Sequence, residues 1–422
     1  MLLNFENIIQ YKLDNGLEVI LYQDKDIPMV TTNIWYRVGS SSEVGGKTGL
    51  THLFEHMMFQ GSKNVAKGEH FRFIQEAGGL ANASTSIDRT NYYNRVPSNF
   101  IELPLWLEAD RMGSFVDSIN QEKLSNQIDV VKNERLERYD NQPYGLAWEL
   151  IFSNMFNKKH PYHAPVIGWM NDILSYSIED VVTFYKKHYG PSNACLVLAG
   201  DIEFESSIKL IEKYFAGIPR FLTQAVEIDY DFSSLKESLK ITKEETVDLE
   251  KVFLVWQSAK AFDVDDSVYG ILSDLLTGSK NGRLHKDLVL DQQLAISVSA
   301  NQSNGKYDGL FWISSTGKTR GNLEQIKNII FHRLEEIAEN GVEERELQRS
   351  KNSLKSGYVM SLESIVNIAD RLNLYNFYTG NPNGFEIDYQ RFSAISSEEV
   401  QSCAKKLLNS PFFELQFLPK ET

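Results

Sequence analysis

Cysteine and long apolar runs are both scarce in this chain of 422 residues. Its two cysteines, Cys195 and Cys403, cannot form a disulfide framework and lack the CxxC spacing of a zinc or redox pair, so we expect both to be small buried side chains. No stretch of about 18 apolar residues occurs, which predicts that there is no membrane span. The opening MLLNFENIIQYKLDNGLEVIL lacks the basic and apolar regions of an intact signal peptide, so the compartment stays open between the cytoplasm and, if a leader has been removed, the periplasm.

Positive charge is also in short supply. The chain has 43 Lys and Arg against 57 Asp and Glu, a formal net charge of −14. Proteins that bind nucleic acid need clustered Lys and Arg to meet the phosphates, and no such cluster occurs, so we expect no nucleic-acid partner. An acidic surface instead favours neutral or basic peptides.

An internal repeat is the most informative feature of the chain as a whole. The segment SIEDVVTFYKKHYGPSNACLVLAG begins at Ser177, and SSEEVQSCAKKLLNSPFFELQFLP begins 219 residues later at Ser396. Both read as a capped amphipathic helix, a turn and an apolar strand. The strand-like segments around Trp35 and Trp256 are displaced by 221 residues. Two displacements that agree so closely predict a duplicated domain.

The repeat sets the expected domains and fold class. We predict a first domain at 1–220, a polar linker at 221–234 and a homologous second domain at 235–422. Alternating apolar strands occur together with amphipathic helices in each half. We therefore expect an α+β fold of two homologous α/β sandwich domains, each a mainly antiparallel sheet covered by helices.

The stretch GLTHLFEHMMFQGS, residues 49–62, concentrates metal-binding chemistry. With Thr48 as N-cap and Gly61 after the last turn, it reads as a helix of about three turns. His52 and His56 then lie at i and i+4 on one face, the spacing that lets two imidazoles reach one ion. Glu55 projects from nearly the same face and can address a water molecule as a general base.

A core cluster is the alternative for this stretch, since the intervening residues are strongly apolar. They are Leu53, Phe54, Met57 and Met58. Two histidines and a glutamate buried among them would need polar partners, however, and a metal ion supplies those partners. We therefore favour the metal site, which the sequence places in the first half and not in the second.

A third ligand is predicted in the helix QEKLSNQIDVVKNERLERYD, residues 121–140. Its apolar stripe consists of Leu124, Ile128 and Val131. The next position on that stripe is Glu134, an acid where a hydrophobic side chain is expected. We favour Glu134 over Glu137 as the ligand, and an ion pair of Glu134 with Arg135 or Arg138 is the alternative.

These motifs resemble the pitrilysin/insulinase family of zinc metallopeptidases. His52, Glu55 and His56 match its HxxEH motif, and VVKNERLERYDNQPYG follows at the family's spacing. YKLDNGLEVIL, EAGGLANASTSIDRTNYY and YGPSNACLVLAGD extend the match over nearly the whole chain. The resemblance is to the shorter bacterial members, which are similar to the β subunit of mitochondrial processing peptidase.

The resemblance implies roles for individual residues. His52, His56 and Glu134 would bind one Zn²⁺, and Glu55 would be the catalytic base. Gln127 stands where the family often has a second glutamate, and we expect this to tune the site modestly. The segment GGLANASTSID resembles an edge strand to which substrate adds as a further strand, with Asn82 and Ala83 against the scissile region.

The second half lacks residues that active members of the family usually supply. Val289 and Ile296 stand where those members have an Arg and a Tyr that hold substrate and stabilise the oxyanion. Neither side chain can donate a hydrogen bond. We therefore expect a homologous partner subunit to provide the Arg and Tyr in a heterodimer. In the alternative alignment, Arg283 or Tyr307 provides this function within one chain.

The expected function is that of a zinc-dependent endopeptidase acting on extended peptide substrates, as the metal-bearing subunit of a two-chain enzyme. The alternative is a non-catalytic assembly subunit or a peptide-binding subunit of the same fold, like the relatives that serve as core subunits of a respiratory complex.

Overall fold

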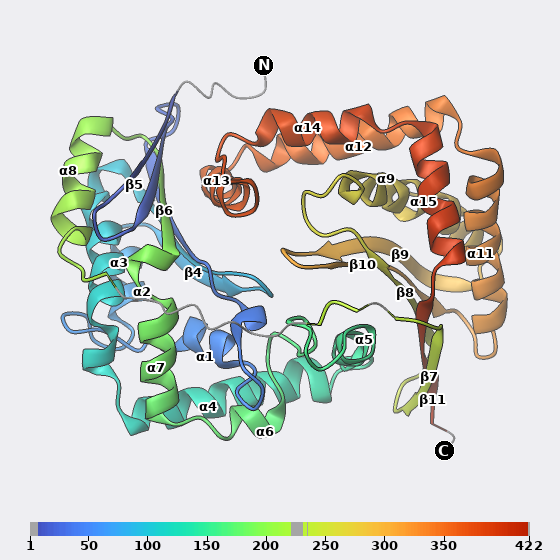
Figure 1. Ribbon diagram of the computed structural model, residues 1–422, viewed down its shortest axis with the longest axis horizontal. Helices are drawn as coiled ribbons and strands as arrows, with labels where there is room; N and C mark the ends of the chain where they lie inside the picture. The colour runs from blue at the N-terminus through green and yellow to red at the C-terminus, as the bar shows by residue number, and fades with distance from the viewer. Residues whose placement is uncertain (1–6, 221–230, 234, 421–422) are drawn as a thin grey trace. The chain divides into compact units, whose positions relative to one another are not determined.

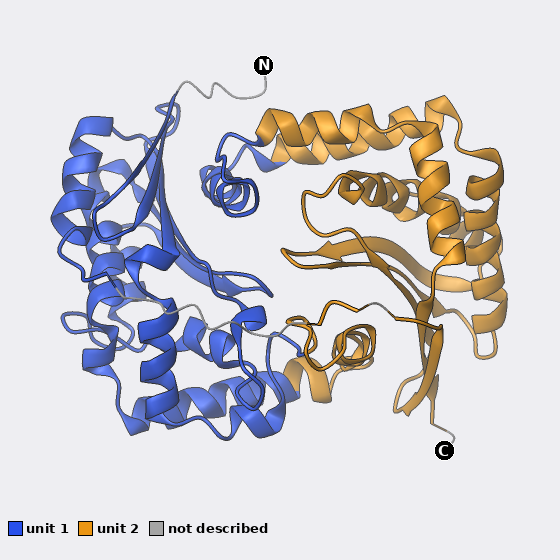
Figure 2. Cartoon of the chain, in the orientation of Figure 1, with its two compact units in different colours: residues 1–136, 164–229, 361–384 blue, residues 137–163, 230–360, 385–422 orange. Residues whose placement is uncertain are grey.

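The computed structural model describes residues 7–220, 231–233 and 235–420, which form two compact units (Figure 2). Neither unit is one continuous segment of the chain. Unit 1 consists of residues 1–136, 164–229 and 361–384, and unit 2 of residues 137–163, 230–360 and 385–422. The chain therefore passes from one unit to the other five times.

Unit 1 is built on a six-stranded sheet. Its strands are β1 (Ile8–Lys12), β2 (Glu18–Gln23), β3 (Met29–Tyr36), β4 (Leu80–Thr85), β5 (Thr90–Pro97) and β6 (Ala194–Gly200). They lie in the order β1-β2-β6-β3-β5-β4. All neighbours are antiparallel except the parallel pair β2 and β6. Within the part of the chain that the structure describes, strand β4 pairs with β5 alone, so it is an edge strand.

Helices cover both faces of this sheet. They are α1 (Leu50–Met57), α2 (Glu69–Glu76), α3 (Glu102–Ser114), α4 (Gln121–Arg135), α6 (Met170–Ile173), α7 (Ile178–His188), α8 (Phe204–Phe215) and α13 (Ile365–Thr379). Tyr36 and Tyr92, from β3 and β5, are fully buried on the face that α1 covers, where the Tyr92 hydroxyl donates to the carbonyl oxygen of Phe54 at 3.1 Å. The core of unit 1 lies on this face.

Unit 2 repeats the same sheet without the first strand. Its strands are β7 (Leu239–Glu245), β8 (Lys251–Ser258), β9 (Ala295–Asn304), β10 (Gly309–Gly317) and β11 (Phe412–Pro419). Their order, β7-β11-β8-β10-β9, matches β2-β6-β3-β5-β4 strand for strand, with β7 and β11 as the one parallel pair. The predicted fold class, two homologous sandwich domains with mainly antiparallel sheets, is confirmed.

The helices of unit 2 also divide between two faces. They are α5 (Ala147–Met155), α9 (Asp266–Thr277), α10 (Arg283–His285), α11 (Leu323–Asn340), α12 (Glu344–Ser361), α14 (Phe385–Ala394) and α15 (Ser397–Asn409). Apolar side chains of α9, α11 and α15 join Trp256 and Phe311 of the sheet in one buried core.

Each sheet has one face covered by a helix from the distant half of the sequence. In unit 1, α13 packs on β3 and β6, and Asp370 of α13 accepts hydrogen bonds from Trp35 Nε1 at 2.9 Å and Asn33 Nδ2 at 3.2 Å. In unit 2, α5 packs on β11 (Figure 1). Trp148 of α5 lies edge-on to Trp312 of β10, with ring centroids 5.2 Å apart.

This exchange means that the compact units differ from the halves 1–220 and 235–422 that the repeat defines. The repeat is defined by the strands, which recur in the same order in both halves. The compact units are defined by packing, which places α5 with the second sheet and α13 with the first. Most of the predicted linker, 221–234, lies outside the described residues. Cys195 and Cys403 are both buried, as predicted. No helix in the described part of the chain is long and apolar enough to cross a membrane.

A buried polar network lies beneath the sheet of unit 1. His70 of α2 is 5% exposed, and its Nε2 lies 2.8 Å from Oδ1 of Asn94. The Asn94 amide donates to Glu108 at 2.7 Å, and Glu108 also accepts from Arg111. Because the ring is buried, and because the Arg111 guanidinium lies nearby, the pKa of His70 is lowered to about 4.

This network predicts a loss of stability in acid. His70 has a lower pKa in the folded chain than in the unfolded chain, so its contribution is complete above about pH 6.5 and is lost as the pH falls toward 4, an effect of about 3 kcal/mol. In urea titrations at pH 7 and pH 4, His70→Gln should lose less unfolding free energy than the wild type. Equal losses in both proteins would contradict this assignment.

Candidate metal centre

The helix that carries the two candidate histidine ligands is shorter than its sequence suggests. Helix α1 covers Leu50–Met57, about two turns, and Gly49 is its N-cap with φ of 84°. The prediction of Thr48 as N-cap is wrong, because the Thr48 hydroxyl donates to Asp172 at 2.6 Å instead. Gly61, with φ of 108°, lies beyond the end of the helix rather than directly after its last turn.

A carboxylate replaces the expected hydroxyl cap. The two oxygens of Glu43 accept hydrogen bonds from the backbone N–H groups of Gly49 and Thr51, each at 2.7 Å. Burial raises the pKa of the Glu43 carboxyl to about 8, although the two amide hydrogen bonds act in the opposite direction. When the side chain is ionised, above about pH 8, its negative charge also complements the helix dipole.

The start of α1 is held against a second loop by direct backbone contact. Gly49 and Gly168 both have left-handed φ, 84° and 83°. A Cβ on Gly49 would lie 2.3 Å from the Ile167 carbonyl oxygen, and one on Gly168 would lie 2.3 Å from that of Thr48. The Gly168 carbonyl oxygen in turn accepts a 2.7 Å hydrogen bond from Arg135 at the end of α4. One loop therefore holds the start of α1 and the end of α4.

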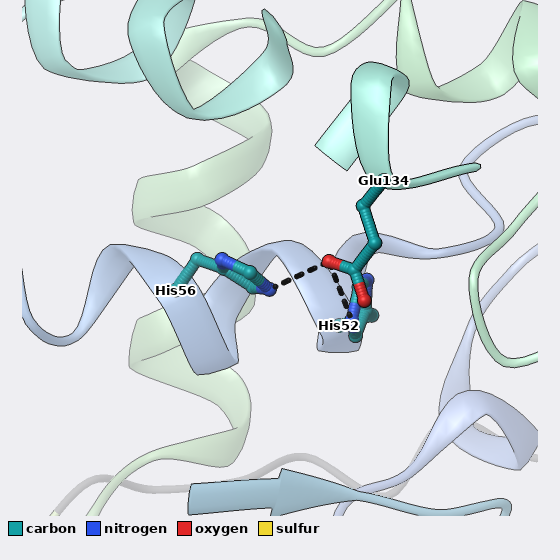
Figure 3. A group of neighbouring side chains, drawn as sticks. All are labelled: His52, His56 and Glu134. Atoms are coloured by element: carbon teal, nitrogen blue, oxygen red, sulfur yellow. Dashed lines mark ion pairs between the residues drawn. The ribbon is translucent and has the colours of Figure 1, made fainter. Parts of the chain in front are cut away.

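The two helices bring three candidate ligands together (Figure 3). Glu134 Oε2 lies 3.3 Å from His56 Nε2 and 3.8 Å from His52 Nε2, and all three ligand atoms lie within 4.8 Å of one another. The carboxylate of Glu134 comes from α4 and points at the two imidazoles of α1. The structure therefore places Glu134, rather than Glu137, against the histidines.

The opposite side of α1 carries the apolar residues. Leu53, Phe54 and Met57 are completely buried, whereas the side chains of His52 and His56 are 12% and 26% exposed. The helix thus has a core face and a separate polar face. The alternative of a simple core cluster does not describe these histidines.

The donor set fits zinc. Zinc prefers imidazole nitrogen and carboxylate oxygen at about 2.0 to 2.2 Å in a tetrahedral arrangement, which requires ligand atoms about 3.3 to 3.6 Å apart. The two distances to Glu134, 3.3 and 3.8 Å, bracket that separation. Three protein ligands leave a fourth position for water, which is typical of a catalytic zinc site rather than a structural one.

The predicted base, Glu55, is held by a residue that sequence reasoning missed. Its Oε2 accepts a 2.7 Å hydrogen bond from the hydroxyl of Thr85, at the end of β4. Within the described residues, no donor reaches the other oxygen of Glu55. The sequence held one signal for Thr85: it lies two residues after Ala83, so the two side chains lie on the same face of the strand.

The predicted substrate-binding residues lie on edge strand β4. Asn82 is exposed and Ala83 is buried. The backbone N–H of Ala83 donates to Oδ1 of Asn82 at 2.9 Å. On α4, Gln127 is 6% exposed, so the position where the family often has a second glutamate is an uncharged buried amide here.

Unit 2 shows no comparable group of ligands: among the described residues, His52, His56 and Glu134 are the one group of His, Cys, Asp and Glu side chains close enough to hold a metal ion. Helix α9 of unit 2 instead buries Ile271, Leu272, Leu275 and Leu276 completely in the core. Asp274 on the same helix accepts a 2.9 Å hydrogen bond from Ser353 on α12.

The residues considered for substrate stabilisation in the second half are placed as follows. Val289 is partly buried against the core, and Ile296 is 54% exposed at the start of β9. Arg283 forms a bidentate pair with Glu346, with N–O distances of 3.0 and 2.7 Å. The backbone N–H of Tyr307 donates to the hydroxyl of Tyr162 at 3.0 Å.

Known proteins resemble the chain along its whole length. The zinc protease PqqE of Helicobacter pylori is 28% identical over 85% of this chain and 80% of its own length. The uncharacterized zinc protease YmxG of Bacillus subtilis is 23% identical over 96% of this chain and 97% of its own. The probable mitochondrial-processing peptidase subunit β of Arabidopsis thaliana is 23% identical over 94% of this chain and 75% of its own.

Solved structures and family models agree with these relatives. The crystal structure of a protease from Helicobacter pylori matches with a TM-score of 0.91 over 98% of this chain and 99% of its own, at 25% identity. The model of the insulinase family (peptidase family M16) matches residues 18–167, and that of the peptidase M16 inactive domain matches residues 175–354. The chain therefore belongs to the insulinase family of peptidases, family M16.

Proposed function

We propose that this chain is a zinc-dependent endopeptidase that hydrolyses extended peptides, and that it is the metal-bearing subunit of a two-chain enzyme. The convergence of His52, His56 and Glu134 beside Glu55 is the observation that carries the proposal. The relatives named zinc proteases support it.

The chemistry divides between the ion and the chain. Zinc, when bound by His52, His56 and Glu134, supplies a Lewis acid that lowers the pKa of water and polarises a carbonyl group. Glu55 removes a proton from the attacking water through the carboxylate oxygen that Thr85 does not engage. The protonated Glu55 then delivers that proton to the nitrogen of the leaving amine.

Strand β4 gives the substrate its conformation. An extended peptide that pairs with this open edge gains backbone hydrogen bonds independently of its side chains. Asn82 and Ala83 lie on this strand, three and two positions before Thr85, respectively. We therefore assign them to substrate binding, and the Asn82 carboxamide would exchange its bond to Ala83 for one to the peptide.

A partner chain completes the proposed enzyme. Val289 and Ile296 leave this chain without the Arg and Tyr that the family uses at the developing oxyanion. Arg283 is engaged in its bidentate pair with Glu346, which argues against its replacing them. A homodimer would contain the same Val and Ile twice, so we propose a homologous but different partner.

The metal assignment predicts a loss of zinc on removal of one imidazole. His56→Ala should abolish stoichiometric zinc binding, because two protein ligands rarely retain zinc against solvent. Metal analysis of the purified variant measures this directly. The matched control is His332→Ala, at a histidine whose side chain is 65% exposed on α11. Undiminished zinc in His56→Ala would refute the ligand set.

The base assignment predicts activity loss without metal loss. Glu55→Gln preserves shape but cannot accept the proton, so peptide hydrolysis should fall by roughly 10²-fold or more while zinc content stays stoichiometric. Glu205→Gln, at a side chain that is 86% exposed, is the control. Near-normal turnover by the zinc-loaded Glu55→Gln enzyme would show that another group activates the water.

The partner assignment predicts weak activity of the chain alone. Loss of one oxyanion donor commonly costs about 10²- to 10³-fold, so a chain lacking both should turn over an unstructured peptide very slowly until the homologous partner is added. Full activity of the isolated chain that is lost in Arg283→Ala or Tyr307→Phe would overturn the two-chain proposal. Peptide binding without zinc or turnover, with the partner present, would instead identify a peptide-binding subunit.

A further inference from the structure

The carboxylate of Glu55 is held from outside its own helix. Its side chain is partly buried, and the Thr85 hydroxyl, 2.7 Å from Oε2, is the one hydrogen-bond donor that reaches it within the described residues. A glutamate side chain has several rotatable bonds, and fixing them costs conformational entropy. On the two-turn helix α1, Thr85 is what selects one orientation of this carboxylate.

The hydroxyl that makes this bond is itself fixed. Thr85 is β-branched, which restricts its first side-chain torsion, and its backbone pairs with Thr90 of β5. Thr90 is completely buried, and its hydroxyl donates to the carbonyl oxygen of Val38 at 2.9 Å. The position of the Thr85 donor is therefore set by the sheet.

The same strand would also position the substrate. A peptide that adds to edge strand β4 takes its register from the backbone of residues 80–85, the last of which is Thr85. The same rigid strand would thus fix the positions of both the general base and the peptide backbone. A base displaced by even about 1 Å can lose much of its rate advantage, so this common reference has catalytic value.

From this geometry we propose that Thr85 is a positioning residue for Glu55, which aligns the base with a peptide bound to β4. The bond to Oε2 leaves the other carboxylate oxygen for the water that Glu55 deprotonates. The inference rests on the proposed peptidase function, but it concerns a residue for which neither the metal motif nor the edge-strand assignment gives a role.

The test compares a substitution that removes the hydroxyl with one that keeps it. Thr85→Val replaces the hydroxyl with a methyl group of nearly equal size, and kcat for an unstructured fluorogenic peptide should fall roughly 10- to 100-fold, with KM and zinc content unchanged. Thr85→Ser keeps the hydroxyl and should restore kcat to within about threefold of the wild type. The assay uses the zinc-loaded chain, with the partner chain where turnover requires it. Thr183→Val, at an exposed position on α7, is the control.

A binding measurement separates positioning of the base from an effect on the strand. In the Glu55→Gln background no turnover occurs, so peptide affinity can be measured directly. Addition of Thr85→Val should leave the affinity for the same peptide unchanged, because the proposed role of the hydroxyl is to orient Glu55 and not to bind the peptide. Weaker peptide binding in the double variant would overturn the proposal by showing that Thr85 acts through β4 itself. Thermal unfolding of each variant checks that the fold is retained, and Thr85→Ser tests the hydroxyl even if Thr85→Val unfolds.

The outcomes distinguish this inference from the function on which it rests. If the wild type cleaves the peptide, Glu55→Gln does not, and Thr85→Val equals the wild type, the positioning role alone is refuted. It is also refuted if Thr85→Ser is as impaired as Thr85→Val. If the zinc-loaded wild type with its partner does not cleave peptides at all, the proposed function fails, and the role of Thr85 fails with it.

Discussion

The candidate metal centre depends on a backbone contact that leaves no room for a side chain. Gly49 and Gly168 meet directly, and both adopt a backbone conformation that other residues rarely tolerate. This contact fixes where α1 begins, and the hydrogen bond from Arg135 to Gly168 fixes where α4 ends. The meeting of Glu134 with the two imidazoles follows from these two anchors. Three candidate ligands from two helices are thus positioned by a loop that contributes no candidate ligand itself.

What the sequence could predict is largely what depends on local periodicity. His52, Glu55 and His56 share a helical face because of their spacing alone, and Glu134 interrupts an apolar stripe that is visible without a structure. The duplication was equally legible, because both halves carry matching helices and strands in the same order along the chain. The resemblance to a known family then added two predictions, that β4 is a substrate-binding edge strand and that the metal is zinc.

What the sequence could not predict depends on contacts between distant residues. Glu43, rather than Thr48, caps α1, because a nearby loop brings its carboxylate to two free amides. The bond from Thr85 to Glu55 joins residues 30 positions apart and has no periodic signature. Likewise, no local pattern assigns α5 or α13 to one sheet rather than the other. Each of these features is set by packing, and packing overrides local propensity.

The exchange of α5 and α13 has a consequence for how a duplicated gene can change. A reading frame divided between its two halves would yield two fragments, each with a sheet that lacks one covering helix and a helix that lacks its sheet. Trp35, now 3% exposed beneath α13, would face solvent in the first fragment, and such uncovered apolar faces promote aggregation. The exchange of these two helices therefore favours keeping both halves in one polypeptide.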